Sequence, residues 1–507
     1  MPAVSVPKAV ASSVKSPGLY LVVNLLGGSA SPSSGLLRVL IISPINSAGS
    51  DVTVDTEVRQ VFGPDDVSTG LGSGNPGHLA AKRLFQHYNL ASVDIIGVTE
   101  SAGAAATGTQ TFTGPATANS TIRLDVMGRV IDVPWLSGES ATTFAARAVL
   151  YVNQYSTDLF VTASSSVGDL IYTAKSKGPW GNDVRLNATI IEGGGGIAIT
   201  VNPAACSGGT TEPTFATALS NVDTREYAII LGCLSNADAA TASSSSNADR
   251  IKIHINALNT GNAAKLQTCY IGNSNTIANA KAGAIHRNDP VFEYVFGQTF
   301  RDLPAEVAGA EVGDTLRFIT DQPNFNRIGN KLQLHGPRDT AASKLTATEL
   351  EDLLNNGVSP VDIELNTDEL FISRPITTHS LNGANPDFRC LDITDTHGAY
   401  AVARDLRAAT PIEFANCSIS EDLPPNADPL PPNVVEIKDV RAFVLSRLRS
   451  VWVKRGVVSG AALQASIDAD EFTFEIDSVD PTQVNNVIPL SIIKPLAKIG
   501  QVIRKVA

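Results

Sequence analysis

The sequence has few charged residues for its length. Charged side chains make up 17% of its 507 residues, whereas globular proteins usually have about 25%. A soluble monomer normally carries more surface charge, so one interpretation is that much of the surface becomes buried between copies of the chain. The other interpretation is a β-rich protein whose surface consists of small Ser, Thr, Asn and Gly residues. The composition leaves both interpretations open.

Cysteine is scarce, and its spacing argues against two kinds of stabilising site. The cysteines are odd in number, and no pair has C-x-x-C spacing: Cys206, Cys233, Cys269, Cys390 and Cys417. We therefore expect reduced, buried thiols in a cytosolic compartment, without structural zinc or a disulfide framework. The N-terminus lacks the apolar region of a signal peptide, and no run approaches the ~18 apolar residues of a membrane helix. No membrane insertion is expected.

The chain also has fewer basic than acidic residues, 38 against 50. The formal net charge is −12 and the pI is about 5.1. A protein that coats nucleic acid needs a basic footprint to contact the phosphates. We therefore expect no direct contact with nucleic acid.

Recognisable catalytic motifs are missing. Residues 72–77 match G-x-G-x-x-G, but no strand directly precedes them and Pro76 removes a backbone donor, which favours a helix-entry loop. The four glycines at 193–196 are predicted to form a hairpin turn rather than a phosphate loop. His397 could act as a base, but Asp395 is explained more simply as a helix start, and no Ser or Cys has a nucleophile context. We predict no catalytic, cofactor-binding or metal-binding residue.

The chain does contain alternating strand and helix patterns. Residues 36–42 and 93–98 read as strands on either side of a helix at 76–89, and a similar rhythm returns at 228–231, 248–258 and 267–272. Residues 109–212 are mostly β, with a hairpin turning at Met127 and Gly128 and a helix from Ser140 to about 153. The predicted fold class is a multidomain α/β and α+β protein. Its parts are a discontinuous α/β main domain (25–108 and 215–345), an inserted mostly-β domain (109–214) and a C-terminal α+β domain (346–490).

The two ends of the chain are β-prone and stand apart from the folded regions. The N-terminal segment, 1–24, contains a short strand pattern followed by the Gly- and Ser-rich linker 27–35. The C-terminal segment, 491–507, consists mainly of apolar residues interrupted by Lys and Arg. A lone strand on a linker needs the edge of another sheet, in its own domain or in a neighbour. The residues predicted to pair in this way are Leu19, Tyr20, Leu21, Val22, Val23, Ile499, Val502 and Ile503.

The strongest amphipathic helix is predicted at 437–454. Its apolar residues recur at helical spacing, whereas Lys438, Arg441 and Arg449 fall close together on another face. A solvated helix face and a surface that docks on an acidic protein remain two open interpretations of these cations.

Residues 357–378, GVSPVDIELNTDELFISRPITT, read as helix stop, turn, strand, turn and strand. A capping box, Thr346-x-x-Glu349, begins the helix before them. The segment closely resembles the core of the C-terminal domain of contractile-tail sheath proteins. The residues that carry this resemblance are Gly357, Val358, Pro360, Arg374, Ile376, Thr377 and Thr378.

The resemblance extends along most of the chain. Residues 121–153 and 159–186 are similar to the hairpin, helix and following strands of the sheath branch typified by phage Mu, including Lys175, Gly178, Gly181 and Asn182. Residues 17–20 look like the family's Pro-Gly-Val-Tyr arm motif, and 227–230 like the strand that re-enters the main domain. The segment 272–345 and the tail after residue 477 match only loosely.

The resemblance implies a structural polymer rather than an enzyme. Sheath subunits form hexameric rings that stack helically around a tail tube, and their terminal arms add strands to sheets in neighbouring copies. The sheath contracts and drives the tube through the target envelope for genome delivery. The main domain would be subtilisin-like without the catalytic residues. The expected partners are copies of this chain, the tube protein, and the baseplate and tail terminator proteins.

The resemblance also implies a location and a role for the basic face. The protein would belong to the virion tail, assembled in the host bacterial cytoplasm, with Lys438, Arg441 and Arg449 facing the tube and without a cofactor. A tailocin or another contractile injection system remains open. An α/β hydrolase-like enzyme is the alternative from a different class, and a capsid decoration or S-layer-like protein is a third.

Overall fold

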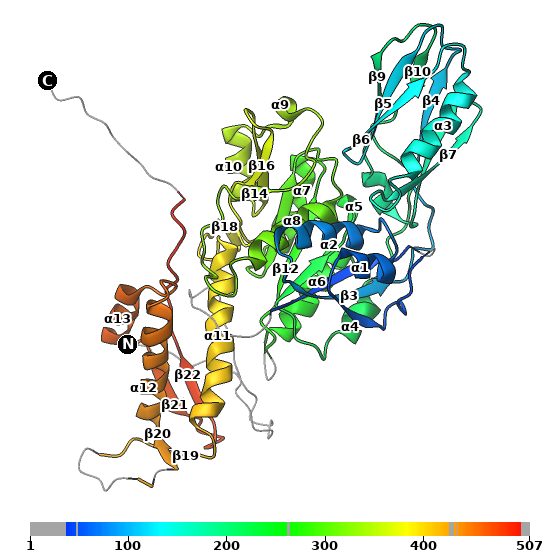
Figure 1. The fold of residues 1–507 in the computed structure, drawn as a ribbon. Helices are drawn as coiled ribbons and strands as arrows, with labels where there is room; N and C mark the ends of the chain where they lie inside the picture. Colours follow the sequence, from blue (N-terminus) through cyan, green and yellow to red (C-terminus); the bar gives the residue numbers. More distant parts are fainter. Residues whose placement is uncertain (1–36, 47–48, 261–263, 425–429, 432, 498–507) are drawn as a thin grey trace, which may run out of the picture.

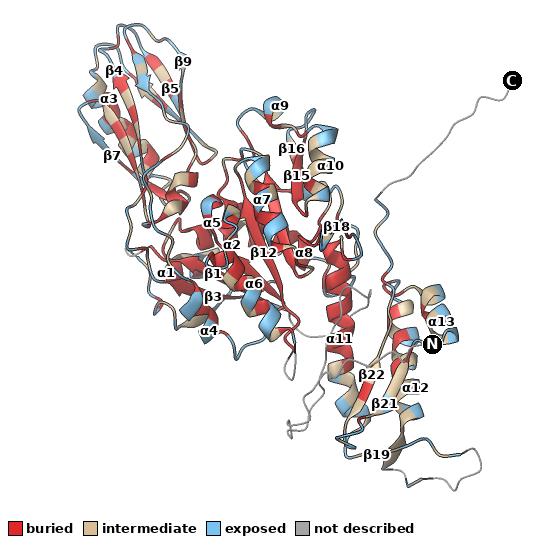
Figure 2. Cartoon of the chain, turned by 180° about the vertical axis from the view of Figure 1, so that it is seen from behind, coloured by how far each residue is buried: buried red, intermediate tan, exposed pale blue. Residues whose placement is uncertain are grey.

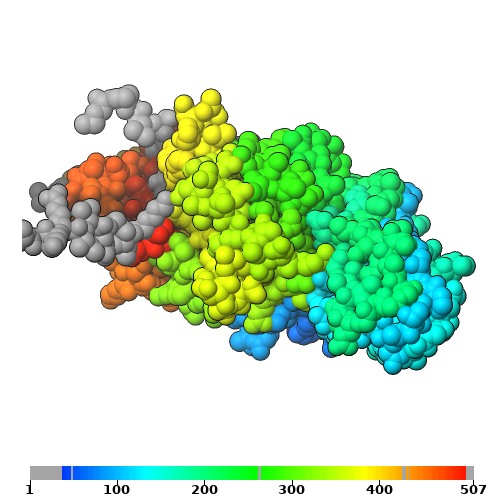
Figure 3. Space-filling model, turned by 90° about the horizontal axis from the view of Figure 1, so that it is seen from above, coloured from blue at the N-terminus to red at the C-terminus, as the bar shows by residue number. Residues whose placement is uncertain are grey.

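The computed structural model describes residues 37–46, 49–260, 264–424, 430–431 and 433–497. Within them the chain is a mixed α/β protein of several parts (Figure 1). The space-filling view shows an elongated molecule, with an inserted β-rich part at one end and a small C-terminal part at the other (Figure 3). The body between them contains the largest sheet.

The body is built on a nine-stranded sheet in the order β14-β16-β15-β13-β12-β11-β1-β3-β2. The six central strands are mutually parallel: β15 (Ser359–Glu364), β13 (Phe292–Gly297), β12 (Thr268–Asn273), β11 (Ile229–Gly232), β1 (Arg38–Pro44) and β3 (Ser92–Val98). Three further strands lie at the margins of the sheet, and each pairs antiparallel with its neighbours: β14 (Lys331–Leu332), β16 (Glu369–Ile372) and β2 (Val58–Val61). Burial on both faces explains why the central strands are rich in apolar residues.

Helices cover both faces of this sheet. Val39 and Ile41 of β1 pack with one set of helices, α1 (Pro64–Leu71), α2 (Pro76–His87) and α8 (Pro304–Leu316). Leu40 and Ile42 pack on the opposite side with the other set, α4 (Ala216–Asn221), α5 (Asn236–Ala240), α6 (Asn247–Leu258) and α7 (Ile277–Arg287). The alternation follows from the two-residue period of a strand. The strand and helix patterns expected near 36–42, 76–89, 93–98 and 228–272 are confirmed.

The segment that resembles the sheath core has the predicted order of elements. Thr346 and Glu349 form the capping box of α10 (Ala347–Asn355), which follows the short α9 (Thr340–Ser343). Gly357, at φ +76°, ends this helix and leads into β15. β15 and β16 lie beyond residue 345, where the main domain was expected to end, yet both are hydrogen-bonded into the nine-stranded sheet. The domain limits themselves stay predictions.

An insert between β3 and α4 consists of two small sheets and a helix. The sheets have the orders β10-β4-β8-β7 and β6-β5-β9. Their elements are β4 (Thr107–Thr113), β5 (Ser120–Val126), β6 (Arg129–Trp135), α3 (Ala141–Asn153), β7 (Val161–Ser166), β8 (Asp169–Ala174), the 3₁₀ helix Pro179–Asp183, β9 (Leu186–Glu192) and β10 (Ala198–Val201). Trp135 and Phe144 stack with ring centroids 4.3 Å apart and lie in the insert's core.

Two local predictions in the insert are confirmed and one is wrong. Met127 and Gly128 form the turn between β5 and β6, with φ of 54° and 81°. Ser140 caps α3 by accepting a hydrogen bond from the Thr143 N–H. Residues 193–196 do not form a hairpin turn, because β9 and β10 pair with different strands, β5 and β4. The glycines carry the chain from one sheet to the other.

A single long helix, α11 (Ile393–Glu413), joins the body to the small C-terminal part. It follows the short pair β17 (Leu381–Asn382) and β18 (Asn385–Pro386). Its first half is buried, and its second half is more exposed (Figure 2). The expected helix start at Asp395 is wrong: the helix begins at Ile393 with Asp392 at the N-cap position, and Asp395 lies in the first turn.

The C-terminal unit has a core of its own. We use this name for β19 (Ser418–Ser420), β20 (Val434–Glu436), α12 (Ile437–Arg447), the π-helical turn Leu448–Val453, α13 (Gly460–Asp468), β21 (Thr473–Ile476) and β22 (Val484–Val487). Leu448, Trp452 and Phe472 pack there against Val402 and Leu406 of α11. The amphipathic helix predicted at 437–454 is thus α12 continued by the π-helical turn. In the described part of the chain, no helix is long and apolar enough to cross a membrane.

Candidate functional site

The residues predicted for strand exchange cannot be placed. Leu19, Tyr20, Leu21, Val22, Val23, Ile499, Val502 and Ile503 lie outside the described residues. Their role in contacts between copies stays a prediction. The sheet that could receive such strands is described, however, and lies in the C-terminal unit.

That sheet is the antiparallel hairpin β21–β22. Its register runs from Thr473 opposite Val487 to Ile476 opposite Val484. Within the described chain, no residue outside the hairpin forms a hydrogen bond with the backbone of either strand. Two strands alone bury little and leave rows of N–H and C=O groups facing outward. Both outer edges can therefore accept a further strand.

The predicted basic face lies on α12 and the turn after it. The Lys438 Nζ is 2.6 Å from Glu436 Oε2, and the Arg441 Nη2 is 2.9 Å from Asp470 Oδ1. Arg449 donates a 2.8 Å hydrogen bond to the Gln464 side chain. Exposed pairs of this kind are weak because solvent screens them, so these cations can exchange their partners for an outside surface. Their orientation toward a tube stays a prediction.

α11 connects the body and the C-terminal unit through side chains along its length. On the body side, the Asn259 amide donates a 2.9 Å hydrogen bond to the Tyr400 hydroxyl, and the Thr396 hydroxyl donates one of 2.6 Å to the Pro290 carbonyl. Farther along, Asp405 accepts hydrogen bonds from Arg447 and Trp452 of the C-terminal unit. One continuous helix therefore carries contacts with both parts.

An ionic cluster whose carboxylates are buried lies beside α11. Arg327 pairs with Glu311 and lies 3.7 Å from Asp314 and 3.9 Å from Glu293. Burial, with the nearby Glu311 charge, raises the pKa of Glu293 well above its ordinary value. Shifted carboxyls are candidates for catalysis, but the Glu293 and Glu311 side chains are at most 1% exposed. We interpret the cluster as structural.

One group of side chains in the described residues has the spacing of a metal site. It consists of Asp302, Glu306 and His335. The Arg83 guanidinium already lies between them, 2.8 Å from Asp302, 3.0 Å from Glu306 and 2.8 Å from the His335 Nδ1. The backbone N–H groups of Leu303 and Gly336 bind the remaining carboxylate oxygens. The arginine supplies the positive charge that a metal would bring.

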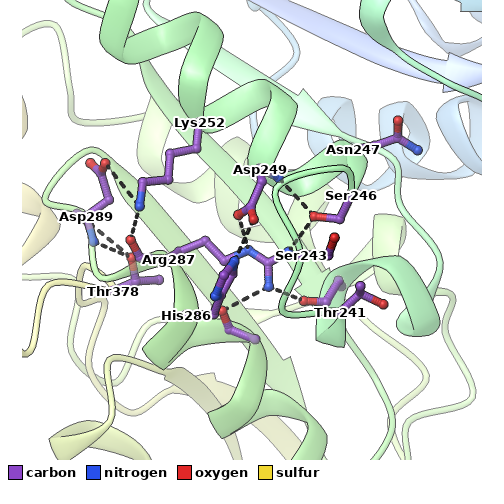
Figure 4. Close-up of polar contacts among 12 residues, drawn as sticks. Thr241, Ser243, Ser246, Asn247, Asp249, Lys252, His286, Arg287, Asp289 and Thr378 are labelled. Carbon is purple, nitrogen blue, oxygen red and sulfur yellow. Dashed lines mark hydrogen bonds and ion pairs between the residues drawn. The ribbon is translucent and has the colours of Figure 1, made fainter.

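Figure 4 shows a Ser, a His and an Asp that lie close together: Ser246, His286 and Asp249. His286 Nε2 is 2.6 Å from Asp249 Oδ2. Ser246 Oγ, however, accepts hydrogen bonds from the Asp249 N–H and from Arg287 Nη2, each at 3.2 Å. A nucleophilic serine needs the histidine as its own partner. Here the serine caps α6, and Arg287 occupies the position of the base.

The crevice that often binds ligands in α/β folds is filled by the insert. In such sheets ligands bind beyond the carboxyl ends of the strands where the strand order reverses, which here is between β1 and β11. Cys233 follows β11 and its N–H binds the Ile42 carbonyl of β1. The buried Trp180 indole of the insert donates a 3.0 Å hydrogen bond to the Cys233 carbonyl. An aromatic side chain therefore occupies this position.

The thiols do not have the properties of nucleophiles. Burial raises the pKa of Cys206, Cys233 and Cys390 to about 12 and that of Cys269 well above its ordinary value. A thiolate is the reactive form, so these four remain protonated. All five cysteines are free, and Cys417 is the one that is partly exposed. His397, considered above as a base, instead contacts the Tyr270 hydroxyl at 2.8 Å.

The two open edges and the anchoring residues of α11 were not found by sequence reasoning. Asp405 and Arg447 are 42 positions apart, and no local pattern links them. The pairing of β21 and β22 could have been expected only in part. The aromatic and β-branched residues of β21 (TFEI) favour a strand, but the second strand, VNNV, has a weak signal.

Comparisons with known proteins gave matches in structure only. No protein-family model and no curated protein matches the chain. The sheath tail protein of Listeria innocua matches with 11% identity and a TM-score of 0.41, covering 85% of this chain and 87% of that one. The sheath tail protein of Desulfitobacterium hafniense matches with 12% identity and a TM-score of 0.42, covering 95% and 99%. A chain of the 6-fold symmetrised anti-feeding prophage baseplate matches with 8% identity and a TM-score of 0.46, covering 97% and 99%.

Proposed function

We propose that this chain is a structural subunit of a contractile tail sheath and not an enzyme. Hexameric rings of the subunit stack helically around the tail tube, and contraction drives the tube through the target envelope for genome delivery. The subunit then belongs to the virion tail, assembled in the host bacterial cytoplasm. It contacts the tube protein and, at the ends of the sheath, the baseplate and terminator proteins.

The observation that carries the proposal is the bare hairpin β21–β22. A two-stranded sheet is marginally stable alone, and both its outer edges are free of hydrogen bonds from the rest of the described chain. The same sequence has two β-prone segments, 19–23 and 499–503, next to linkers. Strand addition fixes a partner through backbone hydrogen bonds, while the linker allows the bodies to move. One chain therefore combines free sheet edges with segments that are predicted to be donated strands.

The order of sequence motifs provides independent support. The sheath-like segments at 17–20, 121–186, 227–230 and 357–378 occur in the family's order. The proposal keeps the predicted parts: linking arms at 1–24 and 491–507, a subtilisin-like main domain at 25–108 and 215–345, an inserted domain at 109–214, and a C-terminal domain at 346–490 that faces the tube.

The role of α11 in the proposal is to transmit force. The C-terminal unit would hold the neighbouring copies and the tube, whereas most of the mass lies in the body and insert. Because α11 is continuous and contacts both parts, a displacement of the C-terminal unit passes to the body through a hydrogen-bonded helix. Lys438, Arg441 and Arg449 belong to this unit, where their side-chain partners also lie, and are proposed to steer it onto an acidic tube surface.

The alternatives differ in what they would require. A tailocin or another injection machine would use the same subunit, and a particle without a genome would identify it. A hydrolase would need a nucleophile next to a base, and the serine nearest to such a setting, Ser246, is bound by Arg287 instead. Labelling by active-site-directed probes would favour the enzyme.

Electron microscopy of the purified chain tests the proposal. The full chain should form rings or sheath-like tubes, and removal of residues 1–24 should abolish them. Successive residues of a strand direct their N–H groups to opposite edges, so Leu21→Pro and Val22→Pro test both edges of the predicted strand. The variant that removes the donor facing the partner should have the same effect as the deletion. Ser29→Pro, in the linker, is the matched control and should assemble normally. Assembly that survives the deletion and both strand prolines would overturn the proposal of arm exchange.

A further inference from the structure

The insert contains four strands at the edges of its sheets. In the orders β10-β4-β8-β7 and β6-β5-β9, the end strands are β10, β7, β6 and β9. An edge strand presents unpaired N–H and C=O groups that can pair with any other strand. This hazard is greatest in a protein that assembles by donating strands, since every copy carries strands in search of an edge.

The edge of β7 is closed by an asparagine side chain. The Asn153 Nδ2 donates a 2.9 Å hydrogen bond to the Ala163 carbonyl, and the Ala163 N–H donates one of 2.9 Å to Asn153 Oδ1. A carboxamide has the donor and acceptor of a peptide group, so Asn153 takes the place that a neighbouring strand would occupy. β7 itself, VTASSS, has no charged residue and no proline, the usual protections of an edge.

The edge of β9 is closed in the same way. Asn202 Nδ2 donates a 2.9 Å hydrogen bond to the Ala188 carbonyl, and the Ala188 N–H donates one of 3.0 Å to Asn202 Oδ1. Next to it, the Leu186 N–H binds the Ala204 carbonyl at 2.9 Å. β9 has a single charged residue, at its end. The two Asn residues come from different elements, α3 and the segment after β10, and form the same contact.

The other two edges carry different protections. β6 contains Pro134, which has no N–H, and its carbonyl accepts a 2.8 Å hydrogen bond from Arg147. The pairing of β10 with β4 shifts register between Ile199 and Val201, which marks a β-bulge or another irregularity of the ladder. Bulges and prolines both disturb strand addition. All four edges of the insert therefore differ from the bare edges of β21 and β22.

We propose that Asn153 and Asn202 determine where strand addition can occur, by closing the insert to strands donated by other copies. This inference rests on the proposed function. Donated strands then find free backbone groups in the C-terminal unit and not on the insert. The two asparagines are specificity-determining residues of assembly, although within the described residues they do not contact the hairpin.

The test replaces the two amides in the full chain. Asn153→Ala with Asn202→Ala should add oligomers and irregular aggregates in light scattering and electron microscopy. Hydrogen exchange should then become slower at residues 161–166 and 186–192 in the associated fraction, because new strands protect these backbones. Asn366→Ala is the matched control, since Asn366 is exposed and its side chain contacts only Glu364. It should behave as the unmodified chain.

A rescue separates edge closure from simple loss of stability. Ser165 on β7 and Thr189 on β9 are exposed, and a lysine on an edge strand opposes pairing without restoring the amide contact. Adding Ser165→Lys and Thr189→Lys to the double variant should remove the extra association. If the lysines leave it unchanged, the association comes from unfolding and the inference is overturned.

Failure of this inference can be distinguished from failure of the proposed function. If the unmodified chain forms no rings or tubes, the sheath proposal fails, yet new protection of β7 and β9 in the double variant would still establish edge closure. If the double variant assembles normally with no new protection on these strands, the inference fails while the sheath proposal stands.

Discussion

Arg447 and Asp405 form an ion pair with two hydrogen bonds, 2.6 Å from Nη2 to Oδ1 and 2.8 Å from Nε to Oδ2. The Trp452 indole donates a third bond, of 3.0 Å, to the same carboxylate. Hydrogen bonding and the Asp405 charge raise the pKa of Arg447. Planar two-point contacts of this kind fix geometry as well as charge. The pair therefore holds α12 against α11.

Asp405→Asn should loosen the C-terminal unit. The substitution removes the charge and one of the paired acceptors while leaving the buried Trp452 N–H and Arg447 in place. Hydrogen bonds to charged groups contribute about 1.5–3 kcal/mol, so the free energy of local opening should fall by about 2 kcal/mol. Hydrogen exchange of the α12 amides measures this directly. The control is Asp132→Asn, which breaks the exposed pair with Arg123 and should change stability by less than about 1 kcal/mol.

The stability of the junction between insert and body should depend on pH through Glu212. Burial, with the nearby charges of Asp238 and Asp183, raises the pKa of Glu212 to about 8, against a hydrogen bond from Ser235 that lowers it. The folded protein thus prefers neutral Glu212. Its contribution is fully present below the unfolded pKa, near 4.5, and is lost as pH rises through about 8. The urea concentration at the unfolding midpoint should therefore decrease as the pH is raised from about 6 to about 9.

Glu212→Gln keeps the shape and removes the titration, so the fall in midpoint over this pH range should become smaller. Glu192→Gln, at an exposed carboxyl on β9, is the control and should retain the full pH dependence. The same fall in both variants would show that Glu212 is not the group responsible. Burial raises the pKa of Asp183 to about 6. Asp183 therefore titrates at lower pH than Glu212, and its effect on the midpoint can be distinguished from that of Glu212.

Gly357→Ala should destabilise the segment that carries the sheath resemblance. Gly357 has φ +76°, and an added Cβ would lie 2.6 Å from the Thr378 carbonyl oxygen. Gly383 has a similar φ of +63°, but a Cβ there meets no atom within 4 Å. Gly383→Ala should therefore cost about 1 kcal/mol from backbone strain alone, and Gly357→Ala about 1–3 kcal/mol more because of the clash. Thermal unfolding of both variants measures the difference, and equal costs would contradict the clash.

Features encoded by neighbouring residues could be predicted from the sequence. Met127 and Gly128 must turn the chain because both adopt positive φ, and Thr346 with Glu349 is a self-contained capping box. The apolar runs of β1 and β11 identify buried parallel strands. In each case the determining contacts lie within a few residues of one another.

Features set by distant contacts could not be predicted. The glycines at 193–196 precede a strand that pairs with β4 rather than with β9, a choice made by the insert's core. α11 begins two residues before the expected start, since Asp395 pairs with Lys494, 99 positions away, instead of capping the helix. The contacts of Asn153 and Asn202 with strand edges have no sequence signature, because any exposed asparagine looks the same. The residues predicted for strand exchange in the two arms lie outside the described residues.

Charge reversal at Lys438, Arg441 and Arg449 should separate tube binding from self-assembly. Replacing all three with Glu opposes an acidic partner surface and should lower affinity for the tube protein about tenfold or more. Ring formation should persist, because β21 and β22 are untouched. The matched control reverses three exposed cations elsewhere: Arg123, Lys177 and Lys331. Unchanged tube binding in the first variant, measured by co-sedimentation, would sink the tube-facing assignment.

Trp180 should anchor the insert to the body. Its indole is 2% exposed and is hydrogen-bonded to the Cys233 carbonyl at the end of β11. Trp180→Ala would leave a cavity beside Cys233, at the end of β11, and should cost about 3–5 kcal/mol. Trp180→Phe keeps most of the volume and loses the hydrogen bond, so it should cost about 1–2 kcal/mol. Chemical denaturation gives both values.

The same pair of variants bears on the enzyme alternative. If the crevice were a ligand site that the insert merely covers, removing the indole would expose polar groups poised for chemistry, and active-site-directed probes would begin to label the chain. The groups found there are a protonated thiol, Cys233, and Ser43, whose hydroxyl is hydrogen-bonded to Asn75. Neither has a base beside it, so Trp180→Ala should gain no labelling while losing stability. Labelling that appears in this variant and not in Trp180→Phe would instead show that the insert closes a latent active site.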